Sequence, residues 1–415
     1  MRFLFIVTSY WAYGELAIAC EFAKRLVKEG GQVHFLVPPT HQKTMNSWGF
    51  GFTTLFVKSR ALNVILLKDI ESSFRPQAVI LADFLNYNFC EEHYGLTYND
   101  LAVFSGKIGT FDDFDWTQTK DCMDTYGFRA KRFSEIDVRK YGFSLCPCPL
   151  VNPGDGDREE TFFYRLIDRK LPFSLDKTNE YKKSLEIPTE RKMILFTNAV
   201  WQDNYKKYDD VKEFVNVNQT IFWYLMECLA KKYTIICIGK ESFYKKSNEN
   251  IIFIDSVPPD VFDRYILATD LFLSRNIIST SLARAVLSGI PCVCIQNSLR
   301  FKRNANGEIN VTIPYRNDFV NEQLNKLQRS YKYRMFPVGW YYFLQNIYDN
   351  NPYFDTFCQV EQFDIEHTVN TITSLLENRN AYDKLRSKLT QYETILNKLP
   401  NIAEISYQII GGSER

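Results

Sequence analysis

The chain has 415 residues, which is too many for one ordinary hydrophobic core, so two domains are expected. Apolar residues make up 45% of the chain and charged residues 24%, the balance of a folded, soluble protein rather than a disordered one. Lysine and arginine total 50 against 49 for aspartate and glutamate, giving a net charge of +1. A nearly neutral chain has no global field to attract a polyanion, so the composition argues against a dedicated nucleic-acid-binding protein.

The cysteines and the apolar runs indicate the cellular setting. Ten cysteines stand at irregular spacings, without the pattern of a zinc site or a disulfide framework. The apolar stretch 3–7 is too short for a signal-peptide core, and no run is long enough to cross a bilayer. We therefore expect a soluble, cytoplasmic protein without a transmembrane segment; a peripheral membrane association stays open.

Strand and helix patterns alternate through the first hundred residues. Periodic apolar positions predict a helix over 14–28, ended by two glycines, and continuous apolar runs predict strands over 3–7, 32–37 and 78–82. This order predicts a parallel sheet with right-handed crossovers. The acid-, glycine- and proline-rich stretch 104–153 favours loops and short helices over a cleft.

A polar, lysine-rich stretch over 171–188 is the expected linker between the domains, and a second alternating series follows it. We predict two Rossmann-like α/β domains facing each other across a cleft, over 1–178 and 190–415. The last helices, from Ile365 onward, are expected to cross back to the first domain. The predicted strands of the second domain are 193–196, 234–238, 251–254, 271–273 and 292–295, and its predicted helices are 220–231, 259–267 and 281–288.

Two segments resemble the GT-B glycosyltransferases. The first is Gly14-Glu15-Leu16-Ala17 with the helix through 22–26, which ends at Gly30 before the next strand. The second contains the strand-then-proline element 253–258 and the alanine, aspartate and apolar-strand element 268–273. It continues through Ser279-Thr280-Ser281 and 285–291, which resemble the donor-binding helix of that family. The resemblance implies two Rossmann-like domains, with an acceptor bound by the first and a nucleotide-sugar donor bound by the second.

Three positions depart from the family pattern. Asn276-Ile277-Ile278 stands where many members have His-Gly-Gly before the donor helix. Arg284 stands where members often have a glutamate that holds the donor ribose, and Glu15 stands where many have a catalytic histidine. These departures bear on the identity of the donor and on the catalytic base.

The implied donor site surrounds the start of the helix over 281–288. Free N–H groups, the positive end of the helix dipole and the hydroxyls of Ser279, Thr280 and Ser281 suit a departing diphosphate, and Arg275 or Arg284 could add a cation. The alternative interpretation makes the hydroxyls an ordinary helix cap and Arg284 a solvated side chain. Strand ends of the second domain supply three further candidates, which could equally be turn residues: Asn198, Gly239 and Lys240.

The catalytic candidates lie in the first domain. Glu15 could act as the general base that deprotonates an acceptor hydroxyl, or it could merely favour the first turn of its helix. Asp83 follows the strand over 78–82 and could assist, or could serve as a structural cap.

Acids gather between 112 and 115. Asp113-Phe114-Asp115 resembles the Asp-x-Asp metal motif of the other large glycosyltransferase fold, although the surrounding pattern differs. The acids with Trp116 could instead bind a polar or cationic acceptor, but an acidic surface loop is the favoured interpretation. The four histidines are scattered without ligand spacing, and we expect no metal site and no cofactor.

The sequence therefore favours a metal-independent glycosyltransferase that moves a sugar from a nucleoside diphosphate sugar to a small-molecule, glycan or peptide acceptor. A nucleotide-sugar 2-epimerase of the same fold is the alternative enzyme. A catalytically silent binding module is the alternative from another class. Nucleic acid is not an expected partner.

Overall fold

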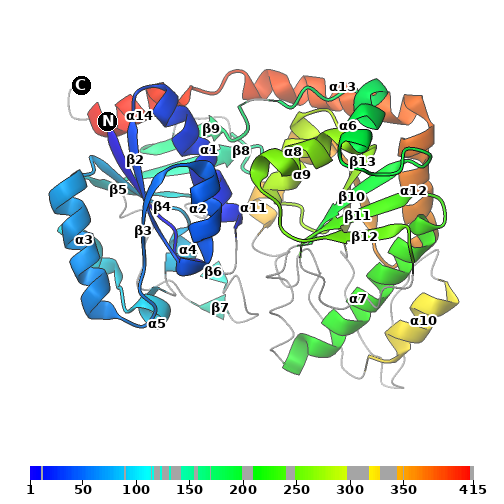
Figure 1. The fold of residues 1–415 in the computed structure, drawn as a ribbon, viewed down its shortest axis with the longest axis horizontal. Helices are drawn as coiled ribbons and strands as arrows, with labels where there is room; N and C mark the ends of the chain where they lie inside the picture. Colours follow the sequence, from blue (N-terminus) through cyan, green and yellow to red (C-terminus); the bar gives the residue numbers. More distant parts are fainter. Residues whose placement is uncertain are drawn as a thin grey trace.

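The structure is a computed structural model that places two parallel β-sheets side by side, each with helices on its faces (Figure 1). This arrangement confirms the predicted α/β class with two Rossmann-like sheets. The first sheet is built within residues 2–165 and the second within 193–361. The residues that the structure describes are 1–10, 13–87, 90–113, 115, 122–123, 130–131, 142–153, 158–168, 170–198, 209–239, 248–296, 317–327, 344–348 and 350–411.

The first sheet has the strand order β3-β2-β1-β4-β5-β8-β9, and every neighbouring pair is parallel. Its central strands are almost fully buried, as expected for a sheet covered on both faces. Chain order reverses between β1 and β4, which makes this pair the switch point of the sheet. The strands are β1 (Arg2–Ile6), β2 (Gln32–Val37), β3 (Gly51–Thr54), β4 (Ala78–Leu81), β5 (Lys107–Phe111), β8 (Phe143–Cys148) and β9 (Thr161–Arg165).

Aromatic side chains fill the core against this sheet. Phe5 of β1 stacks on Phe35 of β2 with ring centroids 4.9 Å apart, and Phe22 meets Tyr164 edge-on at 5.3 Å. The helices of this part are α1 (Gly14–Lys28), α2 (Gln42–Trp48), α3 (Arg60–Phe74), α4 (Phe84–Tyr87) and α5 (Cys90–Tyr94), with 3-10 turns at Pro39–His41 and Tyr98–Val103. A short antiparallel pair, β6 (Cys122–Met123) and β7 (Ala130–Lys131), stands apart from the sheet.

The second sheet has the order β12-β11-β10-β13-β14-β15, again with all neighbours parallel. Its switch point lies between β10 and β13. The strands are β10 (Met193–Thr197), β11 (Thr234–Ile238), β12 (Ile251–Ile254), β13 (Leu271–Ser274), β14 (Cys292–Gln296) and β15 (Cys358–Glu361). The helices are α6 (Thr178–Ser184), α7 (Asp209–Ala230), α8 (Pro259–Ala268), α9 (Thr280–Leu287), α10 (Asp318–Asn325) and α11 (Gln345–Tyr348), with 3-10 turns at Leu175–Lys177 and Pro352–Asp355.

Three helices end the chain, α12 (Ile365–Glu377), α13 (Arg379–Leu396) and α14 (Ile402–Gly411). The last of them packs against α1, so the C-terminal segment returns to the first sheet (Figure 1). One cluster of buried apolar side chains joins the two parts and includes Leu26 of α1, Leu282 of α9 and Tyr392 of α13. Among the described residues, no helix is both long and apolar enough to span a membrane.

The expectation of loops and short helices over 104–153 was wrong at 107–111 and 143–148, because β5 and β8 are strands of the first sheet. Gly109 interrupts the strand pattern of β5, which is why β5 was not predicted. A Cβ atom at this position would lie 2.3 Å from the Phe143 ring, so only glycine lets the two strands approach with that ring between them. Pro147 likewise interrupts the strand pattern of β8, because proline is rare inside strands.

The polar linker expected over 171–188 is partly structured, because it contains α6, which packs against α8. Lys182 on α6 is almost fully buried, and its Nζ lies 2.6 Å from Asp270 Oδ2. The same carboxylate accepts a hydrogen bond from the Met193 amide at 2.7 Å. Asp270 therefore fastens α6 to the amino ends of β10 and β13.

Candidate functional site

Open parallel sheets bind ligands at the carboxyl ends of the strands that flank the switch point. In the first sheet these ends are followed by Thr8 and Asp83, and in the second by Asn198 and Arg275. The helices that come after β1 and β13 are α1 and α9, and the two pack against each other. The fold thus brings together the two helices whose starts carry predicted site residues.

The start of α9 shows which predicted hydroxyls have a structural role. Ser279 is the N-cap, and its Oγ accepts the Leu282 amide at 3.3 Å. Thr280 and Ser281 are half-buried, and their hydroxyls make no hydrogen bond within the described part of the chain. Their two amides are among the N–H groups that a helix start leaves available to a ligand.

Two further candidates lie at the carboxyl edge of the second sheet. Asn198 follows β10, and its amide donates to the Ile238 carbonyl at 2.9 Å. Gly239 follows β11 with φ at +118°, and a Cβ there would lie 3.0 Å from the Asn198 carbonyl oxygen. Glycine is therefore required where these two turns approach each other. Lys240, the third candidate, lies outside the described residues.

Arg275 lies over the face of Phe222, with its guanidinium carbon 4.4 Å from the ring centroid, and it donates to the side-chain oxygen of Asn218. Both partners belong to α7. The guanidinium is therefore positioned by α7 at the carboxyl end of β13.

Arg284 forms an ion triad with Glu21 of α1 and Asp263 of α8. Its two terminal nitrogens lie 2.8 Å from a Glu21 oxygen and 2.7 Å from an Asp263 oxygen. Burial raises the pKa of Asp263, and the Arg284 charge opposes that shift. In this conformation Arg284 joins the two parts of the molecule. Its contact with a donor phosphate stays a prediction, and it would require the guanidinium to leave Glu21 and Asp263.

A cavity of about 260 Å³ adjoins this triad and is lined by Glu21, Lys24, Leu171, Pro172, Asp263 and Arg284. Both signs of charge face it, from α1 on one side and from α8 and α9 on the other. None of the other predicted site residues lines this cavity.

Glu15 lies in the first turn of α1 and is 7% exposed. A carboxylate at this position is favoured by the positive end of the helix dipole, whether or not it also serves as a base. Asp83 is half-buried after β4, and its charge contributes to raising the pKa of Asp113. Asp83 therefore lies near the acids that follow β5.

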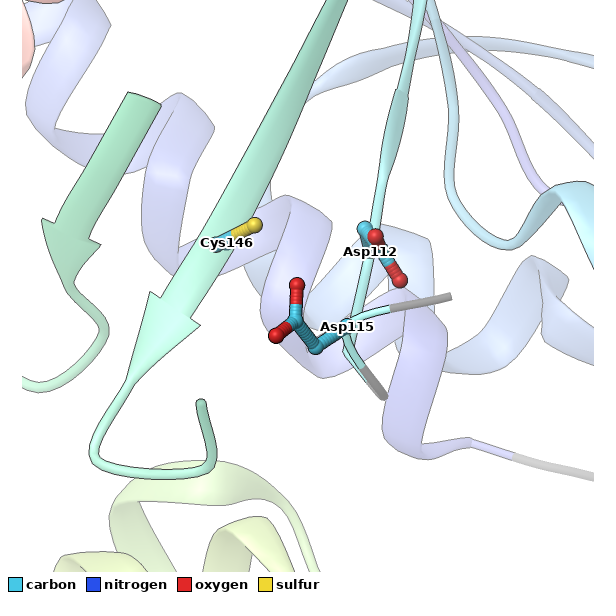
Figure 2. Close-up of side chains that lie close together, drawn as sticks. All are labelled: Asp112, Asp115 and Cys146. Carbon is cyan, nitrogen blue, oxygen red and sulfur yellow. The ribbon is translucent and has the colours of Figure 1, made fainter. Parts of the chain in front are cut away.

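The acids between 112 and 115 do not form the surface loop that we favoured. Asp112, Asp113 and Asp115 are buried, and Cys146 of β8 lies beside Asp112 and Asp115 (Figure 2). The strand register explains this arrangement, because Phe111 pairs with Leu145 and the Asp112 amide donates to the Leu145 carbonyl at 2.8 Å. Burial, with Asp83 and Asp112 nearby, raises the pKa of Asp113 well above its usual range.

An aromatic rim at the carboxyl edge of the first sheet was missed. Tyr10 is 41% exposed and meets His93 edge-on, with ring centroids 4.9 Å apart. Tyr13 is 50% exposed, and its ring centroid lies 4.6 Å from that of His41. Thr40 joins the two pairs, because it accepts from the Tyr13 hydroxyl and donates to the Tyr10 carbonyl. The histidines are far apart in sequence, so their spacing gave no signal, although the tyrosines stand in the loop before α1.

The aspartate motif over 268–273 has a structural role at the opposite edge of the second sheet. Thr269 Oγ1 contacts the Leu195 amide and the Met193 carbonyl, each at 3.2 Å, and Asp270 holds Lys182 as described above. These contacts lie at the amino ends of β10 and β13. The motif therefore indicates the fold, while the predicted site residues Asn198 and Arg275 lie at the other end of the same strands.

The chain belongs to a family of unknown function, DUF6365, whose model matches residues 22–412. No match is found among curated proteins.

Solved structures of similar fold include glycosyltransferases and an epimerase. UGT89C1 from Arabidopsis thaliana, complexed with quercetin, covers 98% of this chain and 99% of its own, with 9% identity and a TM-score of 0.56. A putative UDP-N-acetylglucosamine 2-epimerase from Listeria monocytogenes covers 100% and 98%, with 12% identity and a TM-score of 0.54. The spinosyn rhamnosyltransferase SpnG, complexed with thymidine diphosphate, covers 99% and 100%, with 11% identity and a TM-score of 0.52. The chain therefore has the GT-B fold.

Proposed function

We propose that this member of DUF6365 is a glycosyltransferase that moves a sugar from a nucleoside diphosphate sugar to a small-molecule acceptor. The observation that carries the proposal is the contact between α1 and α9, which joins two Rossmann-like sheets. Helix α1 follows β1 at the switch point of the first sheet, and α9 follows β13 at the switch point of the second. The GT-B fold is consistent with it. We retain the domain division at 1–178 and 190–415 as part of the proposal.

The donor would lie against the second sheet, with its diphosphate at the start of α9. The amides of Thr280 and Ser281 and their two hydroxyls provide donors that already have fixed positions, and the α9 dipole favours negative charge there. Asn198 and Gly239 would border the same crevice from β10 and β11, and Lys240 or Arg275 would supply positive charge. In this scheme the leaving diphosphate is stabilised by the protein's own groups.

The acceptor would lie at the first sheet, where Tyr10 and Tyr13 present exposed rings. Aromatic rings with polar edges suit a planar or partly apolar acceptor that carries a hydroxyl group. Glu15 would take the proton of that hydroxyl as it attacks the sugar carbon, with Asp83 as the alternative base. The bond from the sugar to the diphosphate breaks as the new glycosidic bond forms.

A thermal-shift screen of the whole chain against nucleoside diphosphates tests the donor site. A nucleotide that binds the folded state raises the melting temperature, and a concentration 100 times the Kd corresponds to about 2.7 kcal/mol. The double variant Thr280→Ala/Ser281→Ala should lose most of that shift. Ser279→Ala is the matched control, because its hydroxyl caps the helix and its loss should lower stability by about 1 kcal/mol while binding persists. Unchanged nucleotide binding in the folded double variant would remove the assignment.

A nucleotide-sugar 2-epimerase is the second candidate, favoured by the likeness to the Listeria monocytogenes structure. Release of nucleoside diphosphate that depends on an acceptor distinguishes the transferase from the epimerase. A chain that binds nucleotide but converts no nucleotide sugar would be the silent binding module.

A further inference from the structure

We propose that Asp112, Asp115 and Cys146 form a binding site for a divalent cation of the zinc class. Their three ligand atoms lie within 4.8 Å of one another (Figure 2). A tetrahedral zinc ion separates its ligands by about 3.3–3.8 Å, so small side-chain movements would bring all three atoms to one ion, with water as the fourth ligand. This site belongs to the first sheet and does not depend on the proposed transfer reaction.

The backbone holds the three ligands in place. Asp112 follows β5 directly, and the pairing of Phe111 with Leu145 sets it beside Cys146 of β8. Asp115 has φ at +56°, a left-handed conformation that aspartate tolerates better than most residues. The two aspartates, 34 and 31 residues before Cys146 in the sequence, thus come together with it on adjacent strands.

The surrounding charge also indicates a cation. Asp112, Asp113 and Asp115 are 0%, 9% and 7% exposed, and buried carboxylates are costly unless they are paired. Asp115 is paired with Arg158, whose terminal nitrogen lies 2.5 Å from one Asp115 oxygen. The Asp113 Oδ1 atom is buried and has no hydrogen-bond partner within the described chain. The Tyr164 hydroxyl is a second buried atom that has no hydrogen-bond partner among the described residues.

The ligand types select the metal. One sulfur with two carboxylate oxygens suits zinc or cobalt better than magnesium or calcium, which prefer oxygen alone. On binding, the Cys146 thiol would release its proton to solvent and its sulfur would form the metal bond. Arg158 would act as a positioning residue, because it can hold one Asp115 oxygen while the other faces the metal. The bound ion would join the carboxyl ends of β5 and β8.

Cobalt(II) added to the whole chain after chelator treatment is the direct test, because a thiolate ligand gives a charge-transfer absorption that oxygen ligands lack. We expect one such cobalt per chain, displaced by zinc. Cys146→Ala should abolish the band. Cys148→Ala is the matched control, since Cys148 is equally buried on the same strand but lies outside the ligand set. The cobalt charge-transfer band should persist in Cys148→Ala.

The wild-type chain decides the question even if a variant fails to fold. Absence of the cobalt band, or a melting temperature raised by magnesium or calcium but not by zinc, would overturn the assignment. A band that survives in folded Cys146→Ala would place the metal on other cysteines and overturn it as well.

Discussion

Replacing Arg284 with alanine tests whether the ion triad joins the two parts of the molecule. The guanidinium contacts Glu21 and Asp263 at 2.8 and 2.7 Å, and the three side chains are 17–24% exposed. An exposed ion pair contributes about 0–1 kcal/mol, whereas breaking a fully buried pair costs about 3–5 kcal/mol. For this mostly buried triad we therefore expect Arg284→Ala to lower the free energy of unfolding by about 2–3 kcal/mol at neutral pH.

The effect should depend on pH with a defined sign. Burial raises the folded-state pKa of Asp263 above its unfolded value, and the Arg284 charge opposes this shift. An acid with a raised folded-state pKa contributes stability at low pH that is lost as the pH rises through that pKa. Without Arg284 the pKa of Asp263 rises further, so the loss with increasing pH becomes larger. The difference between variant and wild type should therefore shrink below about pH 4 and grow toward neutral pH.

Denaturant unfolding at several pH values provides the measurement. Arg264→Ala is the matched control, because Arg264 is an exposed arginine next to Asp263 on α8. Its effect should stay within about 0.5 kcal/mol. If Arg284→Ala costs no more than this control, or if its cost does not change with pH, the triad does not join the two parts in the way we infer.

Three further predictions concern the base, the linker and the first sheet. If Glu15 is the general base, Glu15→Gln should lower turnover by about 100–10,000-fold without changing nucleotide affinity. Near-normal turnover with a stability loss of about 0.3–1 kcal/mol would instead show a helix-dipole role and leave Asp83 as the next candidate base. Lys182→Met should cost about 3–5 kcal/mol by leaving Asp270 buried and without its cation, whereas the exposed neighbour Lys183→Met should change the unfolding midpoint little. Gly109→Ala should destabilise the fold by about 1–3 kcal/mol, because its methyl group meets the Phe143 ring at 2.3 Å, and the companion change Phe143→Leu should recover part of that loss in a double-mutant cycle.

The sequence alone determined the elements whose patterns are continuous. The helix Gly14–Lys28 and the strands Gln32–Val37 and Thr234–Ile238 have the predicted bounds, because buried parallel strands are uninterrupted apolar runs and glycines end the helix. Three of the four edge strands, β3, β9 and β15, were not predicted, whereas the edge strand β12 was predicted with its bounds. β9 and β15 contain polar residues because an edge strand is partly exposed, and that pattern is also typical of loops.

Only the tertiary structure decided which distant residues meet. The start of α9 at Ser279-Thr280-Ser281 was predicted from those residues themselves, since capping is a local property of the chain. The contacts of Arg284 with Glu21 and of Asp115 with Cys146 depend on helix packing and on the register of adjacent strands. Neither is encoded by spacing along the chain, because a parallel sheet joins residues separated by a whole crossover. For this reason the acids that resembled a surface loop in the sequence form a buried cluster in the fold.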